Sequence, residues 1–431
     1  MKASKEDRAP VLGGSKLWLL KTLGPGLITG ASDDDPSGIA TYSQAGAQFG
    51  YSLAWTMLLT YPLMAAVQMI SARIGRTTGR GLAGNLRQHY PNWLLQVFVV
   101  LLSVANILNI GADLGAMADS VALVAGGPNT LYVIMFGGLC VGLQVLVQYS
   151  SYVSYLKWLT LALLAYIVTL FIVDVRWTDA LAQFIFPSIT WKVDYINTIV
   201  AVFGTTMSPY LLFWQASQEA EDIRAIPERQ ILKRAPSQGL DALKRIELDT
   251  LIGMGLSNLI ALAIMLTTSA TLNASGITNV ETSAQAAEAL RPIAGNYAAT
   301  IFALGVIGTG LLAIPVLAGS AAYAIGEARK WPVGLARSPK EAKAFYLTIV
   351  IATAVGVELN FTPINPIKAL YWCAVINGVA AVPIMALMML MATNAKIMGE
   401  FAIGAWLKGL GWITTGTMAV AAVAMGLIYL L

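Results

Sequence analysis

The chain has 431 residues, of which 57% are hydrophobic and only 12% are charged, and its formal net charge is +4. Soluble domains carry about a quarter charged residues, so this composition excludes a water-soluble globular protein and indicates an α-helical protein of the lipid bilayer. One histidine and two cysteines without a CxxC spacing exclude a histidine-rich zinc site and a disulfide framework. Both cysteines, Cys140 and Cys373, lie in apolar runs, where a small buried side chain is the ordinary role.

Apolar segments long enough to cross a bilayer recur along the whole chain. A span needs about 20 mostly apolar residues, and about eleven such segments are separated here by polar or basic breaks. The expected spans are 20–48, 51–72, 93–124, 130–149, 152–174, 195–217, 248–272, 297–326, 342–359, 366–394 and 411–431.

Positive charges gather on one side of the expected bilayer. With the N-terminus inside, the cytoplasmic segments hold most of the lysines and arginines, including those of 219–245. The opposite side receives only Arg176, Lys192, Arg291 and Lys368. Cytoplasmic loops of membrane proteins are enriched in Lys and Arg. We therefore expect a cytoplasmic N-terminus and, because the number of spans is odd, an external C-terminus.

Two spans, the first and the sixth, contain residues that break helices. Residues 30–38 read GASDDDPSG and residues 204–210 read GTTMSPY, which places proline, glycine and polar side chains at mid-membrane depth. Proline removes a backbone N–H, and lipid cannot satisfy the backbone groups that a break exposes. An unpaired charge at this depth costs about 3 kcal/mol. Three adjacent aspartates, 33–35, therefore indicate a bound cation and not two plain proline kinks.

The distance between the two breaks predicts internal symmetry. Five spans separate them, as expected of a five-plus-five inverted repeat with a central ion site. We expect one transporter domain, 1–431, built from repeats at approximately 20–174 and 195–394 and an additional helix at 411–431.

The break in the first span carries the most specific motif of the chain. Residues 35–38 (DPSG) and 44–52 (QAGAQFGYS) closely resemble the first helix of the Nramp divalent-metal transporters, whose motif reads Asp-Pro-Gly-Asn. Residues 24–26 (GPG), 113–114 (DL) and 398–401 (MGEF) also resemble that family, and the likeness covers nearly the whole chain. The resemblance implies an all-α membrane protein of the LeuT type, with ten helices in two inverted repeats, broken first and sixth helices, and one further helix.

The ion site that this resemblance implies departs from the family pattern. In the family, an aspartate and an asparagine of the first helix join a methionine sulfur and a backbone carbonyl of the sixth. Here Asp35 is kept, but Gly38 stands where asparagine is expected. Aligned on the proline of the sixth span, Ser208 replaces methionine, Thr205 replaces alanine and Tyr210 replaces histidine. We expect Asp35 to bind the metal, with Gly38, Thr205 and Ser208 lining the site.

The altered residues change the ligand chemistry. A thioether favours soft transition metals, whereas carboxylate, carbonyl, hydroxyl and water oxygens suit hard ions. Mg²⁺ gives up its waters reluctantly and is often bound through one or two carboxylates while it stays partly hydrated. A larger, oxygen-lined pocket around Asp35 resembles the Nramp-related magnesium transporter branch. Mn²⁺, which is similar in hardness, is expected to pass as well.

Further polar residues are candidates for the site or its pathway. Asn377, in the tenth span, is expected to offer its amide to the ion or to one of its waters, the alternative being a hydrogen bond between helices. Asp33 and Asp34 either draw cations toward the site or cap helix ends, and Asp113 is expected to line an exit path.

The residues that would handle protons are the second departure of this sequence from the family pattern. The family's proton-handling groups include acids of the third span and a histidine of the sixth. Asp113 is kept, but Ala116 stands where the second acid aligns, and Tyr210 stands in place of the histidine. Tyrosine, with an unperturbed pKa of about 10, is a poor proton relay at neutral pH. We therefore predict transport driven by the ion gradient and the membrane potential.

The sequence thus predicts a multi-pass importer of Mg²⁺ and Mn²⁺ in a bacterial cytoplasmic membrane, with the metal ion and the lipid bilayer as its partners. No enzymatic activity, cofactor, nucleic-acid partner or obligatory protein partner is expected. One alternative is a proton-coupled Mn²⁺/Fe²⁺ Nramp transporter. Another is an amino-acid transporter of the same fold, although the acids at 33–35 repel a carboxylate substrate. A membrane-embedded enzyme lacks an HExxH or Ser/His pairing here, and liposome uptake separates a transporter from a sensor.

Overall fold

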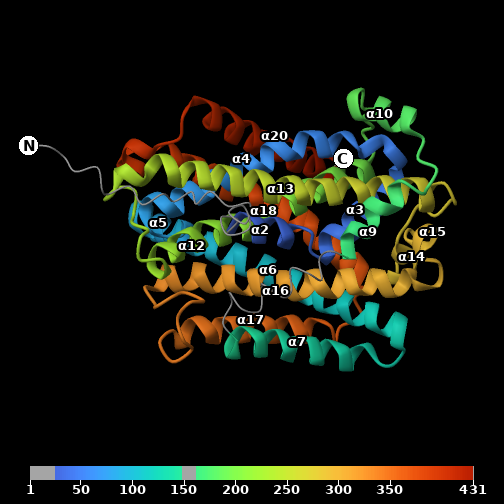
Figure 1. The fold of residues 1–431 in the computed structure, drawn as a ribbon, viewed down its shortest axis with the longest axis horizontal. Helices are drawn as coiled ribbons and strands as arrows, with labels where there is room; N and C mark the ends of the chain where they lie inside the picture. The colour runs from blue at the N-terminus through green and yellow to red at the C-terminus, as the bar shows by residue number, and fades with distance from the viewer. Residues whose placement is uncertain (1–24, 148–161, 431) are drawn as a thin grey trace, which may run out of the picture.

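The protein is described by a computed structural model of residues 25–147 and 162–430, which are helical and contain no β-strand (Figure 1). Eight of the spans in this part are long and apolar enough to cross a membrane. They are Trp55–Thr78, Asn92–Ala125, Asn129–Leu146, Val193–Ala225, Pro236–Asn273, Arg291–Arg329, Pro366–Thr393 and Ala405–Tyr429. The prediction of a polytopic α-helical membrane protein is confirmed.

The other three expected spans differ from these eight in length or in position. The first consists of two short helices, α2 (Pro25–Asp33) and α3 (Pro36–Phe49), neither of which spans a bilayer alone. The ninth is α17 (Lys343–Leu359), a helix of 17 residues. The fifth, expected at 152–174, lies partly outside the described residues, and α9 (Leu164–Leu170) forms part of its remainder.

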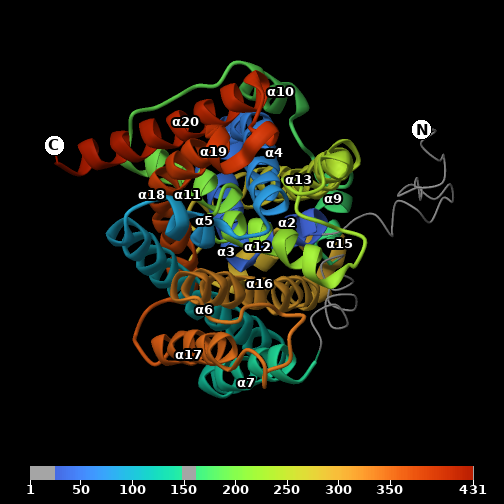
Figure 2. The same cartoon turned by 90° about the vertical axis from the view of Figure 1, so that its left-hand side faces the viewer.

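The helices form two groups that pack against each other (Figure 2). The first group surrounds the helix breaks and comprises α2, α3, α4 (Trp55–Thr78), α11 (Val193–Thr206), α12 (Pro209–Ala225) and α13 (Gly239–Thr268). The second comprises α6 (Asn92–Ala125), α7 (Asn129–Leu146), α16 (Ala298–Arg329) and α17. Elements five spans apart in the chain lie against each other, namely α4 with α13, α6 with α16 and α7 with α17.

The remaining helices complete the sides and ends of the two groups. The long helices α18 (Pro366–Thr393) and α20 (Ala405–Leu430) pack beside α11. The short helices are α5 (Leu82–His89), α10 (Trp177–Ile185), α14 (Ser283–Glu288), α15 (Arg291–Ala294) and α19 (Ala395–Met398).

The two breaks follow from local sequence. Asp35 is the N-cap of α3, because its side chain accepts the Gly38 backbone N–H, and Pro36 occupies the first turn, where its missing N–H costs no helical hydrogen bond. The sixth span repeats this design. Its α11 ends at Thr206, and α12 begins at Pro209, which again stands in the first helical turn. Both predicted interruptions are confirmed.

Glycines let the broken helices approach their neighbours closely. A Cβ at Gly30 of α2 would lie 2.3 Å from the Gly253 carbonyl oxygen of α13. A Cβ at Gly204 of α11 would lie 1.9 Å from the Ala374 carbonyl oxygen of α18. Small residues at such contacts allow the backbone-to-backbone packing that holds helices together in lipid. The helix that precedes each break, α2 or α11, is therefore packed tightly against a neighbouring helix.

Candidate metal centre

Asp35 lies at the centre of the molecule and is 1% exposed. Its Oδ1 accepts hydrogen bonds from the Ser37 hydroxyl at 2.5 Å and from the Gly38 backbone N–H at 2.8 Å. Its Oδ2 accepts from the Asn109 amide and from the Tyr210 hydroxyl, each at 3.1 Å. An ionised carboxylate offers about four acceptor sites, so these donors suit a carboxylate that carries its negative charge.

The same contacts bring three elements together around one oxygen. Asn109 comes from α6, Tyr210 from the first turn of α12, and Asp35 from the break between α2 and α3. The single hydroxyl hydrogen of Tyr210 is also in reach of the Ser32 carbonyl oxygen, at 3.0 Å. The broken first and sixth spans therefore meet at the Asp35 carboxylate, as the predicted central site requires.

The neighbouring acids are held by a different helix. The Ser257 hydroxyl of α13 lies 2.6 Å from Asp33 Oδ2 and 3.2 Å from Asp34 Oδ1. Both aspartates are buried, and Asp33 Oδ1 has no hydrogen-bond partner among the described residues. One hydroxyl hydrogen therefore serves the two carboxyl groups that precede Asp35 in the break.

The residues of the sixth span lie beside the break of the first. A Cβ built on Gly38 would lie 3.1 Å from the Asp33 carbonyl oxygen and 3.3 Å from Thr205 Oγ1. Gly38 and Thr205 therefore face each other across the two breaks. The Ser208 hydroxyl, at the N-cap of α12, donates back to the end of α11, with the Gly204 and Thr205 carbonyl oxygens at 2.7 and 2.8 Å. Back-bonding of this kind is common for serine in membrane helices, and it leaves the oxygen's lone pairs for a cation.

Asp113 and Asn377 are buried with incomplete hydrogen bonding. Asp113 is 0% exposed, and neither of its carboxylate oxygens has a partner in the described part of the chain. Asn377 of α18 is 2% exposed, and its amide nitrogen is likewise unpartnered there. A buried polar group without a partner is costly in an apolar setting. A hydrogen bond or metal contact from a polar ligand or a water would therefore stabilise both side chains.

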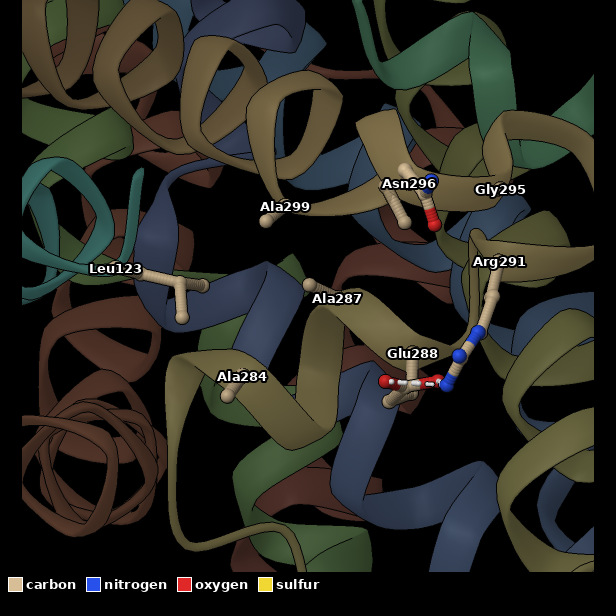
Figure 3. Close-up of a pocket in the computed structure, with 9 residues that line it drawn as sticks. Leu123, Ala284, Ala287, Glu288, Arg291, Gly295, Asn296 and Ala299 are labelled. Carbon is tan, nitrogen blue, oxygen red and sulfur yellow. Dashed lines mark hydrogen bonds and ion pairs between the residues drawn. The ribbon is translucent and has the colours of Figure 1, made fainter. Parts of the chain in front are cut away.

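Two cavities share the short helix α14 in their walls, and the one that also borders α3 is called the inner cavity here. The inner one, of about 10 Å³, is lined by Pro36 and Ala40 of α3 together with α6, α14, α16 and α18. The outer one, of about 240 Å³, lies between α14, α15 and α16, beside the Glu288–Arg291 ion pair (Figure 3). A single water needs roughly 10–15 Å³. The inner cavity therefore has room for about one water beside Pro36, the residue that follows Asp35.

Sequence reasoning missed the residues that hold the aspartates in place. Asn109 precedes Asp113 by four residues, so it lies on the same face of α6, and that spacing could have revealed it. Ser37 sits inside the motif and was overlooked beside Asp35. Ser257 is one hydroxyl among several in α13, and no sequence pattern singles it out.

The arrangement does not hold a metal ion in a preformed cage. Among residues 25–147 and 162–430, no group of three His, Cys, Asp or Glu side chains is close enough to do so. Asp35 is the carboxylate that the two breaks share, and any further ligands are amides, hydroxyls, backbone carbonyls or water. Such a donor set suits hard, oxygen-seeking ions.

Two broken helices that meet around a buried carboxylate, each five spans from the other, define a secondary transporter fold of the LeuT type. Comparison with known proteins narrows this class. The family model described as "Natural resistance-associated macrophage protein-like" matches residues 26–428, so the chain belongs to the Nramp family.

Individual relatives agree with this assignment. The divalent metal cation transporter MntH of Klebsiella pneumoniae is 25% identical over 410 residues, covering 91% of this chain and 90% of its own. A crystal structure of the Eremococcus coleocola manganese transporter has a TM-score of 0.74 at 16% identity, covering 95% of this chain and 87% of that one. Mhp1, a nucleobase-cation-symport-1 transporter in a closed conformation, has a TM-score of 0.57 at 12% identity, covering 94% and 90%. At these identities the two solved structures establish the fold alone.

Proposed function

We propose that this protein transports divalent metal cations, with partly hydrated Mg²⁺ and Mn²⁺ as its main substrates. The observation that carries the proposal is the buried Asp35 carboxylate at the meeting point of the two helix breaks. Relatives named for divalent metal cation transport support the metal class. They do not distinguish Mg²⁺ from Mn²⁺, so the choice of Mg²⁺ rests on the chemistry of the ligands.

Most of the ligand atoms available at the site are oxygens. Gly38 and Ser208 stand where the resemblance places an asparagine and a methionine, so the site loses an amide and a thioether. Asn109 compensates for the lost amide, because it already touches Asp35 and its own Oδ1 is buried without a partner in the described chain. A reorientation of this amide would place an oxygen beside a cation bound to Asp35. Carboxylate and amide oxygens with retained waters suit Mg²⁺.

The remaining assignments belong to the same proposal. Thr205, Ser208 and Asn377 line the site, and Asp34, Asp113 and Tyr210 lie along the pathway. The chain acts as one domain of two inverted repeats in a bacterial cytoplasmic membrane, with the N-terminus cytoplasmic and the C-terminus external. Neither an enzyme reaction nor a cofactor is part of the proposed activity, and no nucleic acid or obligatory protein partner is involved.

A proton-coupled Mn²⁺ transporter is the second candidate. The unpartnered Asp113 favours it, because a buried carboxylate without hydrogen-bond donors is a natural proton acceptor. The amino-acid transporter is less well supported, since the three adjacent buried aspartates would repel a carboxylate substrate.

Uptake by purified protein in liposomes tests the proposal. Mg²⁺ and Mn²⁺ should each enter, and each should compete with the other. Ca²⁺, which is larger and prefers six to eight ligands, should compete weakly. Uptake of Mn²⁺ that excess Mg²⁺ leaves unchanged would contradict the magnesium assignment and favour the second candidate. Absence of uptake for both ions would contradict transport.

A further inference from the structure

The helix that follows the break of the sixth span, α12, is fastened to the second group of helices at the end away from the metal centre. Every residue of α12 from Pro209 to Glu221 is buried. The Glu221 carboxylate accepts hydrogen bonds from the Tyr323 hydroxyl of α16 and from the Ala336 backbone N–H, in the loop between α16 and α17. These bonds join the first group of helices to the second, so α12 separates from α16 only when they break.

The loop between α16 and α17, residues 330–342, places its backbone around this carboxylate. A Cβ at Gly334 would lie 3.1 Å from Glu221 Oε1, and the φ of Gly334 is +138°, a conformation that favours glycine. The Leu335 backbone N–H donates to the Tyr323 hydroxyl oxygen at 3.2 Å. A hydroxyl accepts and donates at once. The loop therefore holds the Tyr323 oxygen while its hydrogen goes to Glu221.

Burial gives these hydrogen bonds their importance. Glu221 is 7% exposed and Tyr323 is 0% exposed, so water replaces the tyrosine donor only when the two helices separate. Loss of a donor to a charged group costs more than loss of a bond between neutral groups. The contact therefore has two distinct states, one complete with α12 against α16 and one broken with α12 moved away.

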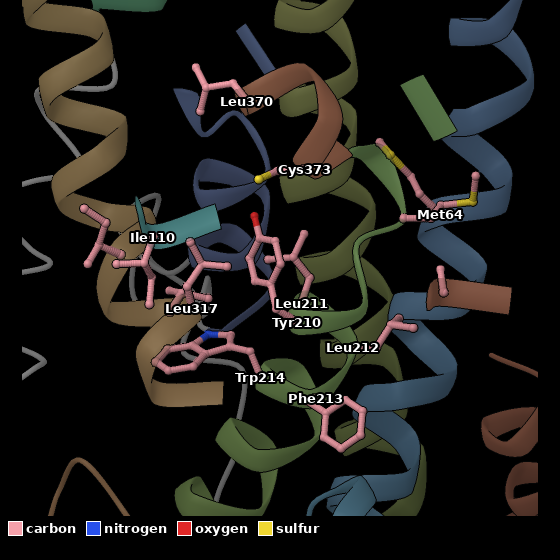
Figure 4. Packing of buried hydrophobic residues seen from close by; sticks show 14 of the residues in the cluster. Met64, Ile110, Tyr210, Leu211, Leu212, Phe213, Trp214, Leu317, Leu370 and Cys373 are labelled. Carbon is pink, nitrogen blue, oxygen red and sulfur yellow. The ribbon is translucent and has the colours of Figure 1, made fainter. Parts of the chain in front are cut away.

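The other end of α12 touches the metal centre. The Tyr210 hydroxyl lies 3.1 Å from Asp35 Oδ2. Tyr210 and Glu221 are eleven positions apart in one helix, which corresponds to a length of about 16 Å. In Figure 4 the ring of Trp214, one turn after Tyr210, extends toward α16, and its centroid lies 6.1 Å from that of the Tyr323 ring. One buried helix therefore connects the Asp35 carboxylate with the Glu221 contact.

We propose that the contact of Glu221 with Tyr323 and Ala336 is a latch, which keeps the cytoplasmic side of the transport pathway closed until a divalent cation binds at Asp35. The loop that contributes to the latch is rich in lysine and arginine, as cytoplasmic loops are. The inference rests on the proposed function, because it takes Asp35 as the cation ligand. It adds the element that releases the cation on the far side.

Competition for one oxygen atom links the cation to the latch. The cation and the Tyr210 hydroxyl hydrogen both bind Asp35 Oδ2, so the cation binds more tightly to the arrangement in which Tyr210 has moved away. A ligand shifts a conformational equilibrium by the difference between its affinities for the two states. Because α12 is one continuous helix, displacement of its first turn draws Glu221 away from Tyr323.

Tyr346 of α17 provides a matched control. Its hydroxyl donates to the Arg337 carbonyl oxygen at 2.8 Å, so it holds the same loop as Tyr323 does. This bond lies within the second group of helices and does not reach α12. Tyr346→Phe therefore removes a hydroxyl contact of the loop alone, whereas Tyr323→Phe removes the donor to Glu221 and keeps the aromatic ring.

The test follows the movement of α12 by thiol labelling. Ser217 of α12 is 1% exposed, and a Cβ at Gly81 would lie 2.5 Å from its hydroxyl oxygen. The Gly81 N–H donates to Glu327 of α16 at 2.8 Å, so movement of α12 away from α16 uncovers position 217. A polar maleimide is added to the purified full-length Ser217→Cys chain in detergent. Mass spectrometry separates the label at position 217 from any label at Cys140 or Cys373.

The Ser217→Cys chain is the parent for every further variant. Tyr323→Phe should raise the labelling rate at position 217 by about tenfold, because it removes a donor to a buried carboxylate. Glu221→Gln should raise the rate as well, and Tyr346→Phe should label as the parent does. Mn²⁺ should raise the rate in the parent and leave it unchanged in Asp35→Asn. Gel filtration checks that each variant is folded.

The outcomes separate the latch from the proposed function. Equal labelling of Tyr323→Phe and Tyr346→Phe would overturn the latch, and Glu221→Gln decides the same question if Tyr323→Phe does not fold. A rate that Mn²⁺ leaves unchanged in a protein that takes up Mn²⁺ would overturn release by the cation. Faster labelling of Tyr323→Phe without uptake of Mg²⁺ or Mn²⁺ by the parent would support the latch and contradict transport.

Discussion

The hydroxyl of Tyr210 lies 3.1 Å from Asp35 Oδ2 and 3.0 Å from the Ser32 carbonyl oxygen, so one side chain of the sixth span joins both groups of the first. A hydroxyl donates one hydrogen, and it serves only one of these oxygens at a time. The Asn109 amide also donates a hydrogen bond to Asp35 Oδ2. A cation that binds Asp35 Oδ2 must displace these donors, which couples metal binding to the contact between the two broken helices.

The first prediction concerns the Asp35 carboxylate. Asp35→Asn keeps the shape of the side chain and an oxygen that can cap α3, but it removes the negative charge from the meeting point of the breaks. Uptake of both Mg²⁺ and Mn²⁺ into liposomes should fall to the background of protein-free vesicles. The control is Asp119→Asn, which changes another aspartate of α6 that lies outside the site, and this variant should transport normally. Full uptake by folded Asp35→Asn protein would remove the central ion site.

The second prediction concerns selectivity. Gly38→Asn together with Ser208→Met restores the amide and the thioether of the family pattern, so Mn²⁺ and Cd²⁺ should gain over Mg²⁺ in competition uptake. The Cβ at position 38 would lie 3.1 Å from the Asp33 carbonyl oxygen, so the break must open by a few tenths of an ångström to accept it. The single variants are therefore expected to impair transport, since the effects of substitutions at neighbouring ligand positions are not additive. An unchanged preference for Mg²⁺ in the double variant would show that these two positions do not set selectivity.

The third prediction assigns a role to Asn109. Removing its amide in Asn109→Ala should weaken Mg²⁺ binding to purified protein by about tenfold, as loss of a group that orients a ligand does. Asn106→Ala is the matched control, because Asn106 is buried one turn earlier and donates to the Leu317 carbonyl and to Ser320. That variant should lower thermal stability while it leaves Mg²⁺ affinity nearly unchanged. Equal affinities for the two alanine variants would argue against Asn109 as a ligand.

Much of the fold follows from simple patterns in the sequence. Hydrophobic runs gave the spans, and the residues DPSG and MSPY located both breaks, because proline and glycine act on the backbone at their own positions. The partners of the aspartates could not be located in this way. Ser257 and Asn109 reach Asp33 and Asp35 from helices far along the chain, so only the packing of those helices brings them together.

The fourth prediction concerns stability. Gly204→Ala places a Cβ 1.9 Å from the Ala374 carbonyl oxygen, so α11 and α18 must separate. Overpacking of this kind costs about 1–3 kcal/mol, or more where backbone must move. The melting temperature of the Gly204→Ala variant in detergent should therefore fall by several degrees or more below that of the parent, about what 1–3 kcal/mol produces. Gly138→Ala, in α7, meets nothing within 4 Å and should melt as the parent does. Equal melting of the two variants would contradict the close α11–α18 contact.

The last prediction is uptake of metal without stoichiometric uptake of protons. Ala116 and Tyr210 replace an acid and a histidine of the family pattern, so Asp113, the acid of that pattern that is kept, lacks both of the relay residues expected with it. The membrane potential supplies about 2.3 kcal/mol per charge per 100 mV, or roughly 4.6 kcal/mol for a divalent cation. At 100 mV this energy corresponds to an accumulation of about two-thousandfold, so a proton gradient is not required for import.

The measurement uses a pH-sensitive dye trapped in liposomes that carry an inside-negative potential. Mn²⁺ or Mg²⁺ should enter at a rate that rises with the potential, while the internal pH stays constant. A proton-coupled member of the Nramp family is the positive control and should acidify the lumen in proportion to metal uptake. Acidification by this protein that scales with metal concentration would show that coupling survives. Asp113→Asn would then be decisive, because loss of acidification with retained uptake would identify Asp113 as the proton acceptor, the one buried acid of α6 that has no hydrogen-bond partner in the described chain.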